Sequence, residues 1–304
     1  MKFVKMQGTG NDYIFIEDFE DKIENPSKLS IILSDRHFGV GGDGVILIKK
    51  SLTADARMQM FNADGSEGKM CGNGIRCFAK LLFEDKKCLK KMKFSKDEIE
   101  SLNSANGSFF LKIETASGIR NVQLKIKDGK VLSVTVNMGF PEFDKKKIPT
   151  LLNENELLKI DDKYYKVCCV SMGNPHCVVF MKEDVDSLDL ENIGKKFENN
   201  RAFPNKTNTE FVNILGENKF KMRVFERGSG ETLSCGTGAC AVVAVAVRNG
   251  MADPNKEILL RLKGGELKIK HTKNGIFLKG NAEKTFEGEI DDDFLKQKKI
   301  LTII

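Results

Sequence analysis

The chain carries one cysteine-centred motif twice, first around Cys71 and again, in the second half, around Cys235. In both copies a Phe stands ten residues before the cysteine, a Glu stands four residues before it, and a Gly-x-Gly pattern follows it. A long motif that recurs at a fixed offset indicates an ancient duplication rather than an array of short repeats. The sequence therefore predicts two related halves, each with one such cysteine.

Two further pairs of segments follow nearly the same spacing as the two cysteines. A Gly-Asn pair ending at Asn11 recurs at Asn174, and the segment 43–47 matches the segment 207–211. The length of 304 residues also favours two domains, because a single hydrophobic core seldom grows to that size. Matched blocks and length together indicate two homologous domains.

We expect an N-terminal domain of residues 1–136 and a C-terminal domain of residues 137–281, divided where Gly and Pro follow the end of a strand. The segment 282–304 has a strand pattern of its own, which the second half does not need. We therefore assign this segment to the N-terminal domain. That domain then holds Cys71, and the C-terminal domain holds Cys235.

Short apolar stretches that end at glycine or charge recur in both halves and indicate many short strands. Helical patterns are few, and the sequence predicts helices over 27–36, 72–84, 188–199 and 236–248. Two of them are apolar and begin directly after the two motif cysteines. The predicted fold class is therefore α+β, with mainly antiparallel sheets and one buried helix in each half.

The composition favours an ordinary globular protein of the cytoplasm. The net charge of +6 comes from lysines spread along the chain, without a nucleic-acid-binding motif. No apolar run is long enough to span a membrane, so we expect no membrane partner, and the segment 1–16 lacks the pattern of a signal peptide. The eight cysteines include no Cys-x-x-Cys pair, so we expect free thiols rather than a zinc site or disulfides.

A thiol at the start of a helix has distinctive chemistry. The first amides have no acceptor within the helix and the dipole adds positive charge, so a thiolate and a bound carboxylate are both stabilised there. Glycines after Cys71 and Cys235 let the backbone approach such an anion closely. Two facing helix starts would grip one carboxylate and place a sulfur on each side of the adjacent carbon.

That arrangement suits inversion of an amino-acid stereocentre. One thiolate removes the α-proton, the opposite thiol delivers a proton to the other face, and amide donors stabilise the intermediate charge. The sequence shows no P-loop and no Rossmann fingerprint. We therefore expect neither a cofactor nor a metal.

At these residues the sequence resembles the diaminopimelate epimerase family, cofactor-independent enzymes of lysine and peptidoglycan precursor biosynthesis. The resemblance extends over nearly the whole chain, and several of its motifs are long and specific. They are KMQGTGND at 5–12, DRHFG at 35–39, FNADGS at 61–66, CGNGIRC at 71–77, MGNPHC at 172–177, TN at 207–208, ERG at 226–228 and CGTGAC at 235–240.

The resemblance implies two like domains related by pseudo-two-fold symmetry, each a β-barrel-like sheet around a central helix, with the active site in the cleft between them. It implies conversion of LL-2,6-diaminopimelate to the meso form by a homodimer without a cofactor. Cys71 and Cys235 would transfer the proton, and His176 and Glu226 would assist them. The positions that would bind substrate are Asn11, Gly44, Asn62, Gly72, Asn73, Asn174, Asn208, Glu226, Arg227, Gly236 and Thr237.

Some assignments stay open. His176 has an alternative structural interpretation, as a ring packed after Pro175. Gly44 stands where some members of the family carry a glutamine that touches the substrate, so only a backbone contact is expected there. Residues 84–108 are longer than usual for the family and show no sustained pattern, so we expect a surface connection. The sequence does not decide which cysteine is the resting thiolate.

Other functions also remain open. A related racemase could act on another amino acid, including the sulfur-bridged lanthionine. A thiol redox or metal-binding protein would use the cysteines differently, and a non-catalytic binding module would exchange no α-proton. Turnover and deuterium-exchange assays separate these classes.

Overall fold

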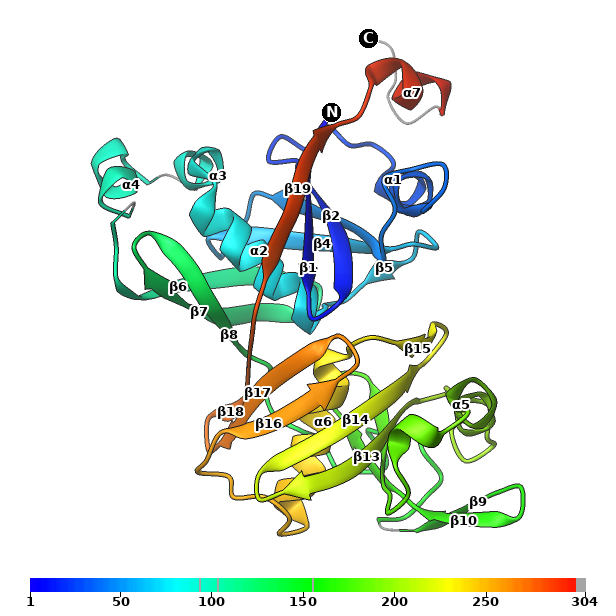
Figure 1. Cartoon of the computed structure of the whole chain (residues 1–304). Coiled ribbons are helices and arrows are strands. Elements are labelled where there is room, and N and C mark those ends of the chain that lie inside the picture. The colour runs from blue at the N-terminus through cyan, green and yellow to red at the C-terminus, as the bar shows by residue number, and fades with distance from the viewer. Residues whose placement is uncertain (93, 103, 155, 299–304) are drawn as a thin grey trace. The chain divides into compact units, whose positions relative to one another are not determined.

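The computed structural model describes residues 1–92, 94–102, 104–154 and 156–298. They divide into two compact units. The N-terminal unit comprises Met1–Val136 and the segment that begins at Gly280, and the C-terminal unit comprises Asn137–Lys279. Strands dominate both units and helices are few (Figure 1), so the predicted α+β class is confirmed.

The strands of the N-terminal unit join in the order β8-β7-β6-β4-β3-β2-β1-β19, and the short β5 pairs with β4. The pairs β2–β3 and β4–β6 are parallel, and the other pairs are antiparallel. The strands are β1 (Lys2–Gly8), β2 (Asn11–Glu17), β3 (Gly44–Lys49), β4 (Ala56–Asn62), β5 (Glu67–Gly68), β6 (Gly107–Thr115), β7 (Gly118–Lys127), β8 (Lys130–Asn137) and β19 (Glu283–Glu289).

The central helix of this unit is α2 (Gly72–Glu84), which contacts β1, β2 and β7. Its Arg76 is fully buried, because each nitrogen of the guanidinium finds an oxygen acceptor. Nε donates to Asn281 O at 3.1 Å, Nη1 to Asn73 Oδ1 at 2.9 Å and Nη2 to Thr9 Oγ1 at 2.8 Å. Arg76 therefore joins the first turn of α2 to the segment after Gly280.

The described residues of the N-terminal unit form four more helices. They are α1 (Pro26–Ser34), α3 (Lys86–Lys91), α4 (Lys96–Leu102) and α7 (Asp292–Gln297). The region 84–108 is a surface connection as expected, since most of its described residues are exposed, but it also contains α3 and α4, which the sequence did not predict. Both helices are short, and Cys88, Leu89 and Ile99 anchor them by burial. Too few apolar positions recur in helices of this length to make the period visible.

The two ends of the described chain meet in the N-terminal unit. Strand β19 pairs with β1 in antiparallel register from Lys2 opposite Glu289 to Gln7 opposite Glu283. The ammonium group of Met1 also donates to Ile290 O at 2.7 Å. The segment after Gly280 therefore completes the first sheet.

The main strands of the C-terminal unit join in the order β11-β12-β13-β14-β16-β17-β18, and the short β15 pairs with β14. The pairs β12–β13 and β14–β16 are parallel, and the others are antiparallel. These strands are β11 (Cys168–Ser171), β12 (Pro175–Phe180), β13 (Asn208–Gly216), β14 (Lys219–Glu226), β15 (Gly230–Thr232), β16 (Ile258–Leu262), β17 (Gly265–Thr272) and β18 (Gly275–Gly280).

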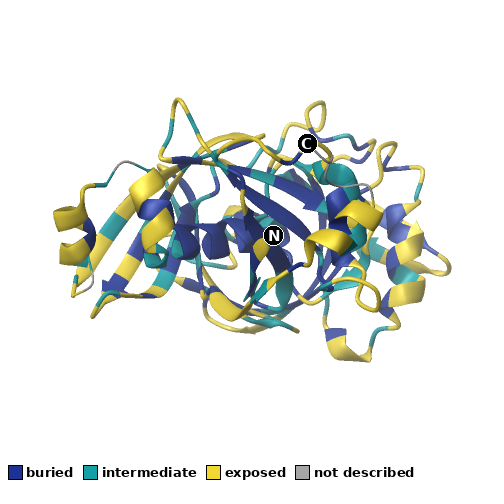
Figure 2. Cartoon of the chain, turned by 90° about the horizontal axis from the view of Figure 1, so that it is seen from above, coloured by how far each residue is buried: buried dark blue, intermediate teal, exposed yellow. Residues whose placement is uncertain are grey.

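The C-terminal unit also holds a separate hairpin, β9 (Leu157–Ile160) with β10 (Lys163–Lys166), a 3-10 turn (Val185–Ser187) and the helices α5 (Leu190–Glu198) and α6 (Gly236–Arg248). Helix α6 is the central helix, and its run Ala239–Ala246 is buried on every side. Alanine and valine make this possible, because small side chains let strands pack closely around a helix that is apolar all round. The core concentrates on strands and central helices, and the exposed residues on turns and short outer helices (Figure 2).

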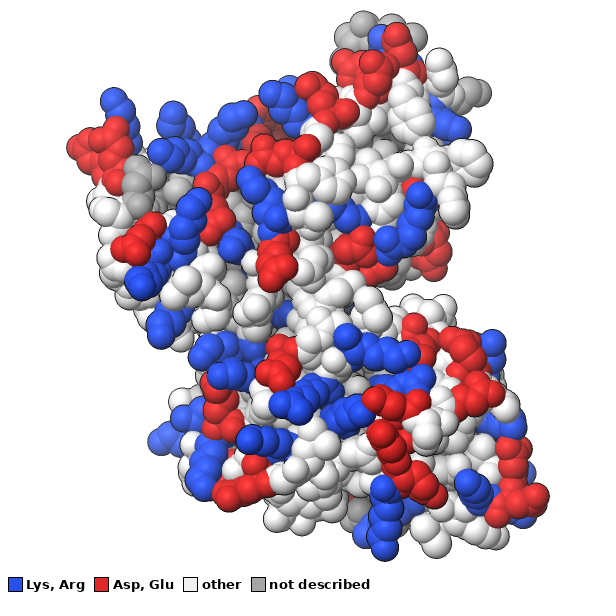
Figure 3. Space-filling view, in the orientation of Figure 1, with Lys and Arg blue, Asp and Glu red and all other residues white. Residues whose placement is uncertain are grey.

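Within each unit the strands follow one scheme of pairing: an antiparallel pair, a parallel step, a second antiparallel pair, a second parallel step and an antiparallel meander. Basic and acidic side chains intermingle on the visible surface of both units (Figure 3), as expected for lysines spread along the sequence. Among the described residues, no helix has the length and apolarity needed to cross a membrane.

Candidate functional site

Cys71 is the N-cap residue of α2 and has an extended backbone. Its sulfur accepts a hydrogen bond from the Gly74 amide at 3.3 Å, and its thiol lies 3.1 Å from Asn11 Oδ1. Asn73 Nδ2 donates to the same Asn11 oxygen at 3.4 Å. The half-site around Cys71, called here the N-terminal half-site, therefore places a partly exposed thiol at the positive end of a helix.

A charged network fixes the side chain of Asn11. Asn11 Nδ2 donates to Asp43 Oδ2 at 2.6 Å, and Arg36 bridges Asp43 and Asp12 at 3.1 and 2.8 Å. Burial raises the pKa of Asp12, but hydrogen bonds from Arg36 and Lys5 outweigh it and leave that pKa below its ordinary value. Ionised carboxylates accept only, so they orient the Asn11 amide with its oxygen towards the thiol.

Tyr13 also reaches Cys71. The ring is buried, as expected of a core residue, but its hydroxyl makes a hydrogen bond with the thiol. Burial raises the pKa of Tyr13 well above its ordinary value, and the charge of Cys71 raises it further. The sequence motifs did not single out Tyr13 as a site residue. Its place in the first copy of the repeat, which matches that of His176 in the second, was the signal that could have marked it.

Asn62 and Gly44 lie opposite each other on β4 and β3. A Cβ atom on Gly44 would lie 2.1 Å from the carbonyl oxygen of Phe61, so only glycine fits there. This agrees with the expectation that Gly44 offers its backbone alone. Asn62 Nδ2 donates to Ser66 Oγ at 2.9 Å, which holds its side chain at the end of β4.

Cys235 is the N-cap residue of α6, and its sulfur accepts from the Gly238 amide at 3.4 Å. Thr237 Oγ1 lies 3.5 Å from the same sulfur. Unlike Cys71, Cys235 is buried, and this burial raises the pKa of its thiol well above the ordinary value. The charges of Glu226 and Glu210 raise it further. The half-site around Cys235, the C-terminal half-site, therefore favours a protonated thiol.

Glu226 stands at the end of β14 and is hydrogen-bonded to both Cys235 and Thr232. Burial raises the pKa of Glu226, although these two hydrogen bonds and the charge of His176 lower it in part. Because the pKa values of the Cys235 thiol and the Glu226 carboxyl group are both raised, a proton stays close to Cys235, as a general acid requires.

His176 and Asn174 complete the C-terminal half-site. Both ring nitrogens of the buried His176 are engaged: Nδ1 lies 2.7 Å from Glu210 Oε1, and Nε2 lies 3.0 Å from Asn174 Oδ1. Asn174 Nδ2 in turn donates to Thr237 Oγ1 at 3.4 Å. Sequence reasoning missed Glu210, although a carboxyl group among the apolar residues of β13 was a signal of a buried partner.

Asn208 and Arg227 lie at neighbouring strand ends of the same unit. Asn208 Nδ2 donates to Pro175 O at 2.7 Å, and its Oδ1 accepts from the Arg227 amide at 3.0 Å. The Arg227 guanidinium donates to the Asn205 carbonyl at 3.1 Å in an exposed position. One such bond leaves further donors of the guanidinium available for a carboxylate.

The first turns of α2 and α6 supply the remaining predicted positions. Gly72 and Asn73 open α2, and Gly236 and Thr237 open α6. Amides at these helix positions have no acceptor within the helix. The structure thus gathers the predicted residues into two half-sites, one per unit. The N-terminal half-site holds Asn11, Gly44, Asn62, Cys71, Gly72 and Asn73, and the C-terminal half-site holds Asn174, His176, Asn208, Glu226, Arg227, Cys235, Gly236 and Thr237.

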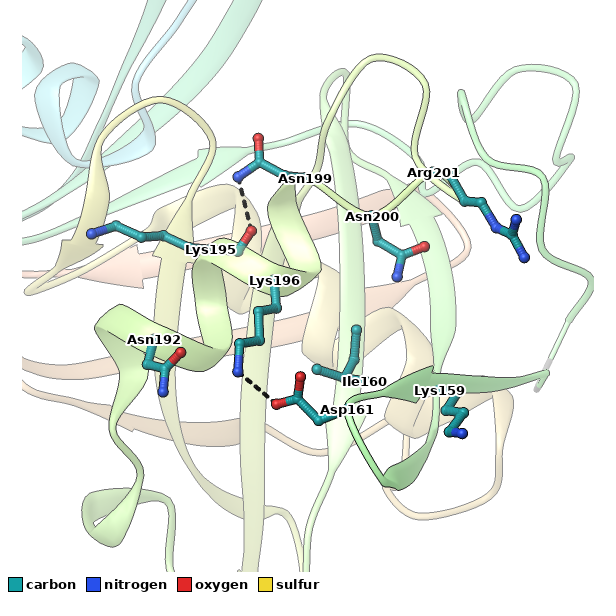
Figure 4. Close-up of a pocket in the computed structure, with 9 residues that line it drawn as sticks. All are labelled: Lys159, Ile160, Asp161, Asn192, Lys195, Lys196, Asn199, Asn200 and Arg201. Atoms are coloured by element: carbon teal, nitrogen blue, oxygen red, sulfur yellow. Dashed lines mark hydrogen bonds and ion pairs between the residues drawn. The ribbon is translucent and has the colours of Figure 1, made fainter.

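The cysteines are free thiols, and within the described part of the chain no cluster of three or more His, Cys, Asp or Glu residues could hold a metal ion. A hollow of about 690 Å³ in the C-terminal unit lies apart from the predicted residues (Figure 4). Lys196 and Asp161 form an ion pair of 2.6 Å across it. Its lining comes from the β9–β10 hairpin and from α5 with the residues that follow: Lys159, Ile160, Asp161, Asn192, Lys195, Lys196, Asn199, Asn200 and Arg201.

The family model described as diaminopimelate epimerase matches residues 3–143 and 168–285 of this chain. The chain belongs to the diaminopimelate epimerase family. Curated diaminopimelate epimerases of similar sequence include that of Acetivibrio thermocellus, 43% identical over 297 residues, with 96% of this chain and 99% of the relative covered. Those of Methanococcus maripaludis strain S2 (96% and 100% covered) and Brachyspira hyodysenteriae (95% and 99%) are each 44% identical.

Solved structures with the diaminopimelate epimerase type of fold include more distant proteins. A probable proline racemase from Agrobacterium radiobacter K84 superposes with a TM-score of 0.70 at 12% identity, covering 100% of this chain and 96% of that one. A hydroxyproline epimerase from Agrobacterium vitis gives 0.66 at 14% identity, with 95% and 91% covered. At such identities these likenesses bear on the fold alone.

Proposed function

We propose that this chain interconverts LL- and meso-2,6-diaminopimelate by moving the α-proton between Cys71 and Cys235, without a cofactor. One observation carries the proposal: each unit caps its central helix with a thiol and opens that helix with glycine. The family to which the chain belongs supplies the substrate. The duplicated halves are then two homologous domains whose half-sites act on one stereocentre.

The chemistry follows from the helix starts. The reacting carboxylate is held by the amides of Gly72–Asn73 and Gly236–Thr237, which aim partial positive charge at the group into which the carbanion delocalises. Electrostatic stabilisation of this kind is commonly the largest contribution to the rate. Removal of the α-proton then needs no electron sink beyond the carboxylate itself.

The two thiols take unequal parts in the resting enzyme. The raised pKa of Cys235 and its hydrogen bond with Glu226 support its role as the protonated acid. Cys71, partly exposed at a helix start and reached by the Tyr13 hydroxyl, is then the thiolate base in that direction. Its hydrogen bond to Asn11 Oδ1 belongs to the protonated thiol, which acts as the acid in the reverse direction. After one turnover the protonation states are exchanged.

Polar side chains bind the far amino-acid end of the substrate. Asn62, Asn174 and Asn208 offer neutral donors and acceptors for a zwitterion, and Arg227 offers a planar fork for its carboxylate. A substrate with only one amino-acid end would leave these groups unpaired, which costs affinity. This favours diaminopimelate over single-ended amino acids.

The test is α-proton exchange in deuterated water. LL- and meso-diaminopimelate should both incorporate deuterium at the inverted centre, whereas proline and alanine should incorporate none. Lanthionine, which has the same two ends, is the informative competitor. Exchange with a single-ended amino acid and none with diaminopimelate would overturn the proposal.

Variants of the two cysteines test the mechanism. Cys71→Ala and Cys235→Ala should each lower kcat for epimerisation by at least about 10³-fold, because one face of the stereocentre loses its proton carrier. Circular dichroism should show an intact fold in both. Cys240→Ala, at a buried position of α6 away from the helix start, is the control and should retain activity. Substantial turnover in either single variant would exclude the two-base mechanism.

The same resemblance supports a homodimer that works in the cytoplasm. Phe110, Ile119 and Leu132 on β6, β7 and β8 are exposed by 69%, 45% and 51%, and a second copy would cover them. Sedimentation equilibrium should then give twice the chain mass of 34.0 kDa. A single species at the chain mass would contradict the dimer alone.

A further inference from the structure

The reaction proposed above gives no role to a fully buried carboxyl group that contacts His176 in the C-terminal unit. Glu210, on β13, is fully buried. Its Oε1 lies 2.7 Å from His176 Nδ1, and its Oε2 has no hydrogen-bond partner among the described residues. Burying a carboxyl group is costly unless it is paired, so its presence beside the site has to be explained by its partner.

The first turn of α6 makes room for this group. A Cβ atom on Gly238 would lie 2.5 Å from Glu210 Oε1, so glycine at this position lets the carboxyl group reach the helix start. In the N-terminal unit the equivalent slot is apolar, because a Cβ on Gly74 would meet Ile46 Cδ1 at 2.8 Å. The repeat offset that aligns the two motif cysteines also aligns Ile46 with Glu210.

The residues next to these two positions also differ between the two copies of the repeat. The offset that aligns Asn11 with Asn174 places Tyr13 opposite His176. Tyr13 bonds directly to the thiol of Cys71, whereas His176 turns its two nitrogens to Glu210 and Asn174. A buried acid–imidazole pair therefore exists in one half-site, and the matching positions of the other hold Ile46 and Tyr13 instead.

The hydrogen-bond inventory fixes where the protons are. A carboxamide oxygen only accepts, so His176 Nε2 must carry the proton that it shares with Asn174 Oδ1. The same orientation of the amide lets Asn174 Nδ2 donate to Thr237 Oγ1 at 3.4 Å. One further proton must lie between His176 Nδ1 and Glu210 Oε1, because two lone pairs cannot face each other at 2.7 Å.

We propose that Glu210 is a positioning residue that, by sharing one proton with His176 Nδ1, keeps Nε2 protonated and thereby fixes the Asn174 amide and the Thr237 hydroxyl beside Cys235. The effect on epimerisation rests on the proposed function. His176 then has no free lone pair to offer the substrate or the thiol. Its part is to orient, and Glu226, which bonds to Cys235, is the group that exchanges protons with the sulfur.

Other titratable groups also face Glu210, and they come from four neighbouring elements. Cys169 on β11 and Cys177 on β12 interact with its charge, as do Glu226 on β14 and Cys235 before α6. All four are acids, and a carboxylate charge nearby would destabilise their ionised forms. The proton on the imidazole offsets that charge. The Glu210–His176 pair therefore screens the half-site from a further negative charge.

Nitrogen NMR on histidine-labelled protein tests the protonation directly. The chain has three histidines, so the spectrum is simple, and His176→Gln assigns the signal. The His176 Nε2 should remain a protonated nitrogen from about pH 5.5 to 8.5, the range in which an ordinary imidazole titrates. His271 is the internal control, because burial lowers its pKa below the ordinary value and its ring should lose its charge at a lower pH than a free imidazole. An Nε2 without a proton at neutral pH would overturn the proposal.

Two variants test the consequence. Glu210→Gln can donate its amide proton to Nδ1, so Nε2 stays protonated and kcat/KM should stay within about threefold of the wild type. Glu210→Ile, which copies the residue of the first half, leaves Nδ1 without a partner and should lower kcat/KM at least about tenfold. Its His176 nitrogen spectrum should also differ from that of the wild type, because Nδ1 has lost its partner.

Asp18→Asn is the matched control, because Asp18 is a carboxylate only 4% exposed and lies in the other unit. It should leave both kcat/KM and the His176 signal unchanged. Equal losses in Glu210→Gln and Glu210→Ile, with unchanged His176 spectra, would contradict the positioning role. The wild-type spectrum needs neither substrate nor a variant, so it decides this proposal even if Glu210→Ile folds poorly. If the spectra are as expected but diaminopimelate is not turned over, the proposed function alone is refuted.

Discussion

Two thiols that the sequence makes equivalent have different surroundings at the scale of the residue. Cys71 is partly exposed and bonded to Asn11, whereas Cys235 is buried beside Glu226. The repeat could predict where both sulfurs are, because the cap position follows from the local motif. It could not predict their protonation, because Tyr13 and Glu226 reach the sulfurs from other strands.

The raised pKa of Glu226 should make the free energy of unfolding depend on pH. Burial raises its folded-state pKa above the ordinary 4.5, so its contribution to stability is complete below about pH 4.5 and falls as pH rises to the folded pKa. Glu226→Gln removes this dependence. Its free energy of unfolding relative to the wild type should therefore increase as pH is raised above about 4.5, measured by urea unfolding at several pH values.

The exposed Glu217→Gln serves as the control, since a carboxyl group that is 76% exposed should give a nearly constant difference. A constant difference for Glu226→Gln as well would show that its carboxyl group titrates alike in both states. Activity is expected to fall in Glu226→Gln independently of pH-dependent stability, because Cys235 loses its proton partner.

At the scale of the element, local patterns predicted most of the fold. The helices expected at 72–84 and 236–248 are α2 and α6 with the same bounds, because a cysteine cap and glycine mark the start and an apolar run marks the length. The helix expected at 188–199 is α5, one or two residues shorter at each end. Strand partners were out of reach, since the parallel pair β12–β13 joins segments that α5 separates in the chain.

Arg76 shows another limit of reading elements from sequence. An arginine in a helix usually indicates a solvent-facing side, yet this one is fully buried. Its acceptors include Gly72 and Asn73 in the same helix and also Thr9 and Asn281, which belong to segments distant in sequence. The spacing of residues within the helix cannot predict partners that lie in distant segments.

Replacing Arg76 tests how firmly α2 is held. Lysine has a single donor group and cannot serve these separate acceptors, so Arg76→Lys should lower the free energy of unfolding by about 1–3 kcal/mol. The first turn that carries Cys71 should loosen, and kcat should fall with it. Arg261→Lys, at a side chain 58% exposed, is the control and should change stability by less than about 0.5 kcal/mol. Equal stability of both variants would contradict the role of Arg76.

At the scale of the whole molecule, duplication is the feature that the sequence announces most plainly. Each unit repeats one scheme of strand pairing around one capped helix. The repeat could not show that Glu210 contacts His176, whereas Ile46 at the matching position packs against the first turn of its helix. Divergence of this kind resides in side-chain partners, which a motif comparison does not contain.

Oxidation tests whether the two half-sites serve one stereocentre. In the substrate-free enzyme a peroxide should join Cys71 to Cys235, with two thiol protons leaving as water and inactivation following the bond. Peptide mapping without reductant should find this pair, and a thiol reductant should restore activity. Burial raises the pKa of Cys77 to about 12, so that thiol should stay unmodified as an internal control. Inactivation with both motif thiols free would speak against opposed sulfurs.

The pairing of β1 with β19 has a consequence for how the protein is made. The C-terminal unit is one continuous stretch, Asn137–Lys279, and can close as soon as it has left the ribosome. The N-terminal unit precedes it in the chain, but β1 keeps an open edge until β19, which follows the C-terminal unit, has been synthesised. The half that is translated first is thus the half that matures last, and a released chain truncated before Gly280 would hold a complete second half and a first half that lacks its last strand.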